Sequence, residues 1–194
     1  MALNILVMLF DRNGARKYLT RAERIAFISA AKQAEPYIET FCLTLAYTGA
    51  RISEVLALIP ARVDMGAQAI TIECLKKRVR GIFRAVPVPV ELLARLEAVH
   101  HTSAGSPERL WPWGRTKAWG VVKKVMADAG VAGPWTMPKG LRHGFGVAGV
   151  AEAGVPLDMM KKWLGHARIE TTAIYTNAIG TEERAIAERM WKRC

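Results

Sequence analysis

Hydrophobic residues recur at helical spacing along most of the chain. The segment YLTRAERIAFISAAKQA, residues 18–34, carries Thr20 and Glu23 three residues apart, a capping box that leads into an amphipathic helix. Glycine and proline residues then mark where further helices begin and end. The pattern predicts these helices over residues 37–49, 52–59, 90–101, 116–130, 138–154, 156–165 and 181–191.

Two segments in the first half of the chain are predicted to be strands. AITIEC, residues 69–74, and IFRAVPVP, residues 82–89, are rich in strand-forming side chains, and the basic segment LKKRVRG joins them as a turn. We therefore expect an α+β fold that is mostly helical, with a small antiparallel sheet. Residues 1–10, MALNILVMLF, fall short of the roughly 20 apolar residues that span a bilayer, so we expect a strand or a docking segment there.

The net charge gives the first indication of a partner. The chain has 28 Lys and Arg residues against 17 Asp and Glu, a formal net charge of +11. An excess of this size is typical of a protein that binds nucleic acid, and a basic surface without a specialised partner is the alternative. Cys42, Cys74 and Cys194 form no CxxC pair, and the histidines have no metal-binding spacing. We expect no metal, no disulfide framework and a cytoplasmic location.

Several basic side chains are candidates for chemistry, and each also has an ordinary structural explanation. Arg51 in YTGARISEVLAL is explained equally well as a helix-start arginine paired with Glu54. The basic run that begins at Lys76 is typical of a solvated hairpin tip. The remaining cluster, KGLRH, contains Lys139, Arg142 and His143.

The segment LGHARIETTAIYT, residues 164–176, sets His166 and Tyr175 nine residues apart. Gly165 is typical of a helix end, which would make His166 a capping residue. Thr171 and Thr172 are β-branched and favour a break in the helix between the histidine and the tyrosine. Tyr175 is then either a packed aromatic residue or a nucleophile.

Taken together, these residues suit the transfer of a phosphodiester. That reaction needs positive charge on the non-bridging oxygens, a nucleophile in line, and a proton for the leaving oxygen. Arginine meets the first need because its planar guanidinium binds phosphate with two N–H groups and stays charged. A tyrosine hydroxyl can form a covalent phosphoryl–enzyme, and a lysine can supply the proton.

Four motifs in this order resemble the tyrosine recombinases, or phage-type integrases. TGARISEVLAL resembles the segment of their first catalytic arginine, and the hairpin that ends in RAVPVP resembles the one that carries their catalytic lysine. KGLRHGFG is similar to the box of the second arginine, and LGHARIETTAIYT to the block that joins histidine and tyrosine. The resemblance runs from about Tyr18 to the C-terminus.

The resemblance implies a role for each matching residue. Arg51 and Arg142 would bind the scissile phosphate, and Tyr175 would attack it to give a 3′-phosphotyrosyl link and a free 5′-hydroxyl. Lys76 would protonate the departing 5′ oxygen, with Lys77 as the alternative because the basic turn is long.

Two further positions follow from the same resemblance. His166 would donate a hydrogen bond to a phosphate oxygen. Lys139 stands where the family commonly has His, and Gly140 where an acidic residue is frequent. Because a lysine is charged at neutral pH, we expect Lys139 to act as a cation and a hydrogen-bond donor.

The resemblance also implies the organisation and the partners. Residues 1–17 would form a short N-terminal segment and residues 18–194 the catalytic domain, without the separate DNA-clamping domain common in the family and comparable to the small fimbrial invertases. The partner would be double-stranded DNA at the nucleoid. The protein would be a monomer in solution and a tetramer on DNA, and it would need no cofactor. The segment TEERAIAERMW would dock either on its own domain or on a neighbouring protomer.

Two alternative functions share this fold, and one motif is misleading. The chain would be a DNA-binding regulator if strand exchange were lost, or a type IB topoisomerase relative if it relaxed supercoils as a monomer. GFGVAG, with Gly144, Gly146 and Gly149, matches the dinucleotide-binding fingerprint, but no strand precedes it. We predict that these glycines let a helix pack closely.

Overall fold

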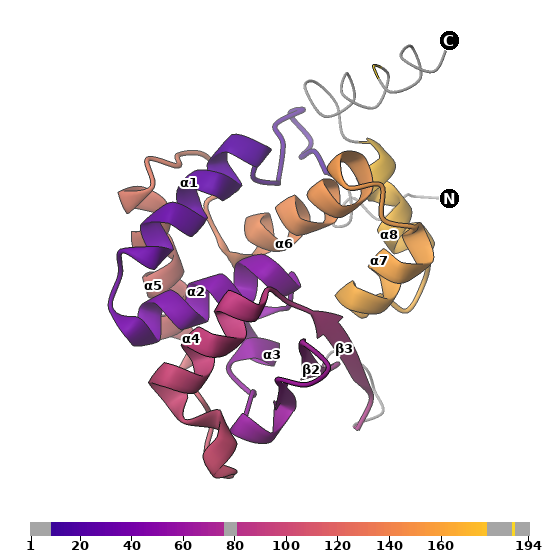
Figure 1. Ribbon diagram of the computed structural model, residues 1–194. Coiled ribbons are helices and arrows are strands. Elements are labelled where there is room, and N and C mark those ends of the chain that lie inside the picture. Colours follow the sequence, from indigo (N-terminus) through magenta and orange to yellow (C-terminus); the bar gives the residue numbers. More distant parts are fainter. Residues whose placement is uncertain (1–8, 76–80, 178–187, 189–194) are drawn as a thin grey trace.

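The computed structural model describes residues 9–75, 81–177 and 188, and this part of the chain is mostly helical (Figure 1). Its α-helices are α1 Arg21–Lys32, α2 Pro36–Thr48, α3 Ile52–Val55, α4 Val90–His100, α5 Arg115–Asp128, α6 Pro138–Val147, α7 Leu157–Leu164 and α8 Glu170–Ala173. Short 3-10 helices are η2 Pro60–Arg62, η3 Thr102–Ala104 and η5 Ile174–Asn177, and η4 Ala148–Glu152 is a π-helix. The strands are β1 Val63–Asp64, β2 Ala69–Glu73 and β3 Phe83–Pro87. The predicted α+β fold is confirmed.

The helix boundaries follow the capping signals of the sequence. At α1 the Glu23 backbone N–H donates to Thr20 Oγ1 (3.4 Å) and the Thr20 N–H donates to Glu23 Oε2 (2.8 Å), so the predicted capping box is confirmed. α2 ends at Gly49, which is left-handed with φ 59°. α7 ends at Gly165 in the same conformation, with φ 66°. Both glycines therefore stand where only a residue without Cβ fits easily.

Two sequence predictions were wrong in extent. The helix expected over residues 52–59 is only the short α3, because the chain turns at Leu56 to bury Leu56 and Leu58 ahead of Pro60. The long helix expected over residues 138–154 changes from α6 to the π-helix η4 at Ala148.

The break predicted between His166 and Tyr175 is present, because residues 165–169 separate α7 from α8. The two threonines lie after this break, inside α8, where the hydroxyl of the buried Thr172 pairs with the His166 ring.

The sheet is antiparallel in the order β1-β2-β3. In the register of β2 and β3, Ile70 faces Val86 and Ile72 faces Arg84. Ile70, Ile72 and Val86 are fully buried, and because side chains alternate along a strand, Arg84 points to the same buried side. A guanidinium thus takes an inward position between hydrophobic residues.

The buried side chains form two clusters. The larger cluster joins α1, α2, α4 and α5 to the sheet and contains Phe41 and Trp111. The smaller cluster contains Leu9, Met160, Leu164 and Tyr175, and it gathers the N-terminal segment with α6, η4, α7 and η5. Figure 1 places α6 between the two groups of helices, and α6 contacts α2 on one side and η5 on the other. α6 is therefore one of the links between the two groups of helices.

The glycines of GFGVAG mark close contacts of α6 and η4 with their neighbours. A Cβ on Gly146 would lie 2.4 Å from Tyr175 Cζ, and a Cβ on Gly149 would lie 1.9 Å from Met160 Cε. Gly140 stands in the same helix, where a Cβ would lie 1.9 Å from the Trp135 carbonyl oxygen. The prediction of close packing is confirmed, and the same limit accounts for glycine at position 140.

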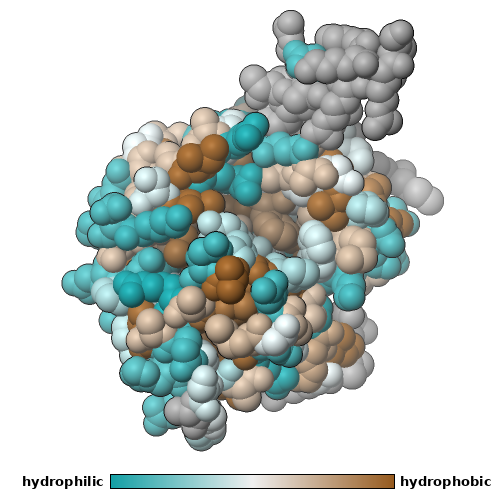
Figure 2. Space-filling model, in the orientation of Figure 1, coloured by the Kyte–Doolittle hydropathy of each residue, from teal (hydrophilic) through white to brown (hydrophobic). Residues whose placement is uncertain are grey.

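Large hydrophobic side chains are exposed at positions spread along the described residues, such as Ile25, Phe83 and Trp119. Hydrophilic residues form most of the face shown in Figure 2, with hydrophobic residues in small groups among them. No helix within the described ranges is long and apolar enough to cross a membrane. The predictions made for residues 1–8, for Lys76 and Lys77, and for the last helix over 181–191 fall outside the described residues.

Replacing Gly49 with Ala tests how tightly the end of α2 is packed. A Cβ there would lie 2.4 Å from Phe145 Cδ1, whereas a Cβ on Gly130, also left-handed at φ +67°, would meet nothing within 4 Å. We expect Gly130→Ala to lower the free energy of unfolding by about 1–2 kcal/mol through backbone strain alone. Gly49→Ala should lose a further roughly 1–3 kcal/mol through overpacking. Urea unfolding of the two variants checks this, and equal losses would contradict it.

Candidate active site

A cleft of about 950 Å³ opens between α3, α6 and the segment that follows α7. Its walls also include Leu75, after the end of β2, and the start of α5. Five of the predicted site residues line it: Arg51, Lys139, Arg142, His166 and Tyr175. The structure therefore brings together residues that are far apart in the sequence.

Arg142 is held by the ends of two helices. Its Nη1 donates to the Gly49 carbonyl oxygen (2.7 Å) and its Nη2 donates to the Leu164 carbonyl oxygen (2.8 Å). These carbonyls lie at the C-terminal ends of α2 and α7, where backbone acceptors are left unpaired and the helix dipole favours a cation. Burial, and then the charge of Arg51, lowers the Arg142 pKa to about 10, so the guanidinium stays charged at neutral pH.

Glu54 fixes Arg51 at the start of α3. The Arg51 backbone N–H donates to Glu54 Oε2 (3.0 Å), and Arg51 Nη1 donates to Glu54 Oε1 (2.8 Å). The pairing expected from their spacing is confirmed. The Glu54 side chain is fully buried, whereas that of Arg51 keeps 31% exposure, so the arginine reaches the cleft from a buried anchor.

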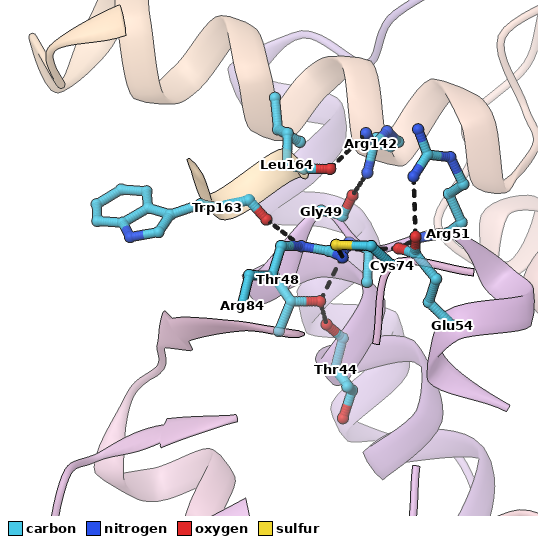
Figure 3. A network of polar contacts seen from close by, with 11 residues as sticks. Thr44, Thr48, Gly49, Arg51, Glu54, Cys74, Arg84, Arg142, Trp163 and Leu164 are labelled. Atoms are coloured by element: carbon cyan, nitrogen blue, oxygen red, sulfur yellow. Dashed lines mark hydrogen bonds and ion pairs between the residues drawn. The ribbon is translucent and has the colours of Figure 1, made fainter. Parts of the chain in front are cut away.

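Arg84 is a third arginine in this network, and the sequence analysis missed it. Its Nη2 donates to Glu54 Oε2 (2.6 Å) and its Nε donates to the Trp163 carbonyl oxygen (2.7 Å), while its Nη1 lies 3.2 Å from Cys74 Sγ (Figure 3). One side chain thus joins α3, the hairpin and the end of α7. The sequence did contain a signal for it. Arg84 and Val86 share the buried face of the strand, and a charged residue is rarely buried unless it is paired.

Burial and charge act in opposite directions on Glu54. Burial raises its pKa, but the guanidinium of Arg84, followed by the backbone hydrogen bond and charge of Arg51, outweighs burial and lowers the pKa below its ordinary 4.5. Glu54 is therefore ionised at neutral pH. Three guanidiniums around one carboxylate leave a positive excess of two charges beside the cleft.

His166 follows Gly165 and takes part in both the fold and the cleft. Its backbone N–H donates to the Lys161 carbonyl oxygen (3.1 Å) and so closes the end of α7, which confirms its capping role. Its ring Nδ1 lies 3.0 Å from Thr172 Oγ1. Burial, and then the charges of Arg142 and Arg51, lowers the His166 pKa to about 3, so the ring is neutral at physiological pH.

Tyr175 lies in the wall of the cleft and is only 1% exposed. Its hydroxyl oxygen lies 3.3 Å from His143 Nδ1, and its ring runs nearly parallel to that of His166, at 14° with 6.3 Å between centroids. Burial raises the Tyr175 pKa to about 12, against the lowering effect of Arg142 and Arg51. The phenol is therefore protonated in this state.

Other cleft residues were not singled out from the sequence. Arg115 and Trp119, on α5, line the cleft, and Trp119 is 47% exposed. Lys139, which the sequence did single out, lines the cleft from the first turn of α6. Within residues 9–75, 81–177 and 188, no group of three or more His, Cys, Asp and Glu side chains is placed to hold a metal ion.

The arrangement suits a phosphate ester better than a small neutral ligand. Arg51 and Arg142 present guanidiniums to the same cleft as His166 and a tyrosine hydroxyl. Guanidiniums in a partly water-excluded site stabilise charge that develops on phosphoryl oxygens. A sequence profile of the phage integrase family matches residues 17–181. The chain belongs to this family of tyrosine recombinases.

Individual relatives agree with this assignment. The type 1 fimbriae regulatory protein FimB of Escherichia coli K12 is 28% identical over 174 residues, which cover 84% of this chain and 86% of FimB. The crystal structure of XerA recombinase matches with a TM-score of 0.76 at 22% identity, over 89% of this chain and 64% of that one. XerH site-specific recombinase, bound to its difH substrate in a pre-cleavage complex, matches with a TM-score of 0.72 at 18% identity, over 94% of this chain and 59% of that one. The chain thus spans about three-fifths of the two structural neighbours, and it shares their fold.

Replacing Arg84 with Met tests whether its pair with Glu54 supports the site. Losing one partner of a buried ion pair lowers the free energy of unfolding by about 3–5 kcal/mol. Arg95→Met is the matched control, because Arg95 Nε donates to Glu39 Oε2 (2.7 Å) with 40% of the arginine side chain exposed. A pair of that kind contributes about 0–1 kcal/mol. Equal losses in urea unfolding would contradict the assignment.

The same variant changes the pH dependence of stability. A carboxyl whose folded pKa is lowered stabilises the fold above its unfolded pKa and loses that contribution as the pH falls through the folded pKa. In the wild type this loss falls below pH 4.5. Without Arg84 the Glu54 pKa rises, so unfolding at acid pH should begin at a higher pH than in the wild type.

Proposed function

We propose that this chain is a site-specific DNA recombinase that cleaves and rejoins DNA strands through a 3′-phosphotyrosyl intermediate. The observation that carries the proposal is the meeting of Arg51, Arg142, His166 and Tyr175 in one cleft. Membership of the phage integrase family supports the same activity.

In the cleavage step the Tyr175 oxygen forms a bond to phosphorus while the bond to the 5′ oxygen breaks. The phenol gives its proton to water in the open cleft, and the 5′ oxygen leaves as a hydroxyl because it receives a proton from Lys76 or Lys77. In the rejoining step the 5′-hydroxyl returns its proton to that lysine as it attacks the phosphotyrosine, and the released tyrosine regains a proton from water. The covalent intermediate conserves the energy of the ester bond, so the cycle needs no nucleotide cofactor.

The two arginines would bind the non-bridging oxygens. Both lie beside the buried Glu54–Arg84 pair, and the local excess of two positive charges matches an ester that becomes more negative in the transition state. Since Glu54 and two helix ends fix these guanidiniums in advance, little reorganisation is needed when DNA binds.

His166 and Lys139 would complete the contacts to phosphate. A neutral His166 ring that accepts the Thr172 hydroxyl at Nδ1 carries its proton on Nε2, which can donate to a phosphate oxygen. Lys139, in the wall of the same cleft, supplies a further positive charge.

The partner in this proposal is double-stranded DNA at the nucleoid, in the cytoplasm. With a net charge of +11, contacts to DNA phosphates should supply much of the affinity. The affinity for DNA should therefore fall steeply as the salt concentration rises. Four protomers would act on two DNA sites. The solved XerH structure, whose fold is similar, is bound to its difH substrate.

A denaturing gel tests the covalent step directly. Incubated with a labelled pool of nicked duplexes of randomised sequence, the protein should retain label through denaturation, because the nick lets the cleaved 5′ end diffuse away. Tyr175→Phe should form no adduct yet bind the pool with wild-type affinity. Tyr37→Phe is the matched control, since Tyr37 is 45% exposed and lies outside the cleft, and it should behave as the wild type.

The same experiment separates the alternatives. Tight binding without an adduct in the wild type would contradict the recombinase and indicate a DNA-binding regulator. An adduct accompanied by relaxation of plasmids that carry no selected site would indicate a topoisomerase-like enzyme.

The leaving-group proton can be assigned to one lysine of the hairpin. Leu75 lines the cleft directly before Lys76, which favours Lys76 over Lys77 as the proton donor. Lys76→Met should slow cleavage about 10²- to 10⁴-fold, the usual contribution of a general acid. A substrate with sulfur in place of the bridging 5′ oxygen should restore the rate, because a thiolate leaves without a proton. If the sulfur substrate restores the rate of Lys77→Met but not that of Lys76→Met, Lys77 is the donor. If it restores the rate of neither variant, no lysine of the hairpin is the donor.

A further inference from the structure

His143 contacts the proposed nucleophile. It follows Arg142 on α6, and its Nδ1 lies 3.3 Å from the Tyr175 hydroxyl oxygen, with 6.0 Å between the ring centroids. The distance is at the long end for a hydrogen bond between these atoms. Both side chains are buried, with 7% of His143 and 1% of Tyr175 exposed.

The other ring nitrogen of His143 is unpaired. Among buried side-chain nitrogen and oxygen atoms of the described residues, His143 Nε2 is the one without a hydrogen-bond partner. A buried polar atom left unpaired is unfavourable, and such exceptions are uncommon in folded proteins. A hydrophobic residue of similar size would avoid this penalty, so the fold alone does not account for a histidine here.

The surroundings of His143 keep its ring neutral. Burial is the first cause, followed by the charges of Lys139, Arg142 and Lys17, and together they lower the pKa to about 3. A ring in this setting does not accept the proton of Tyr175 as an imidazolium. A neutral ring carries one N–H, on Nδ1 or on Nε2. With the proton on Nδ1, the unpaired Nε2 is only an acceptor. With the proton on Nε2, the structure would contain a buried N–H without a partner, which is rarer in protein interiors.

Two further contacts set the position of the Tyr175 ring. Gly146 faces it so closely that a Cβ would lie 2.4 Å from Tyr175 Cζ, and the His166 ring runs nearly parallel to it. These contacts limit where the ring can lie, and His143 is the group that meets its reacting oxygen.

We infer that His143 is a positioning residue for Tyr175, whose hydroxyl oxygen accepts a hydrogen bond from His143 Nδ1 both at rest and as negative charge develops on it during attack. The inference rests on the proposed function, because it concerns the nucleophile of that reaction. A donor aimed at an oxygen that becomes charged favours the charged form and thus promotes attack.

Two substitutions separate this role from a structural one. His143→Leu removes the donor. The gain from losing the unpaired Nε2 is offset by the buried Tyr175 hydroxyl left without this contact, so the variant should melt near the wild-type temperature and bind the nicked pool normally. Its rate of adduct formation should fall about 10- to 100-fold, the usual worth of a hydrogen bond to a charged group. His143→Asn, whose amide N–H lies close to the position of Nδ1, should recover most of the rate.

The pH profile of adduct formation gives a readout that a structural role would not move. Without the donor the pKa of Tyr175 rises. The increase in rate that accompanies loss of the Tyr175 proton should therefore move to higher pH in His143→Leu, but not in His143→Asn. A rate in His143→Leu equal to or faster than the wild type would overturn the inference, and so would a fall in rate that simply follows a loss of stability.

A measurement without DNA keeps the two proposals distinguishable. With ¹³C at Cζ of tyrosine, the NMR signal that disappears in Tyr175→Phe belongs to Tyr175. It should shift in His143→Leu and stay near the wild-type position in His143→Asn, and no shift in either variant would overturn the inference. If the Tyr175 signal shifts in His143→Leu as expected but the wild-type protein forms no adduct, the proposed function alone would be overturned.

Discussion

The candidate site depends on a buried carboxylate that is shared by two arginines. Glu54 would be unfavourable in the interior without partners, because an unpaired charge is poorly solvated there. Arg84 and Arg51 supply these partners from β3 and from the start of α3. The same guanidinium of Arg84 reaches the Trp163 carbonyl at the end of α7, so one ion pair fixes the hairpin, the first arginine and the last part of the fold together.

The ends of helices complete what the ion pair begins. Gly49 and Leu164 present carbonyl oxygens to Arg142, and Gly165 turns the chain so that His166 closes α7 and enters the cleft. Tyr175 follows on η5 and packs into the smaller hydrophobic cluster. The positions of the site residues are thus consequences of caps, a strand face and a buried core.

The sequence predicted much of this and missed what depends on pairing in three dimensions. The capping box at Thr20, the stop at Gly49 and the hairpin are local signals, and three of the four motifs carried the predicted site residues that line the cleft. Arg84 was missed because its strand was predicted from strand-forming side chains alone, without assigning residues to its two faces. His143 was assigned no role because its partner, Tyr175, lies 32 residues away. The early end of α3 was missed because burial of Leu56 and Leu58 decided it.

A crystal structure of the protein with nicked DNA and vanadate would show whether the paired arginines and Tyr175 form one site, since vanadate imitates a phosphoryl group in transfer. We expect the vanadium to bind the Tyr175 oxygen at one apical position, with Arg51 and Arg142 on its equatorial oxygens and Arg84 still paired with Glu54. Vanadate held elsewhere, or held in the cleft with the Glu54–Arg84 pair broken, would contradict this expectation.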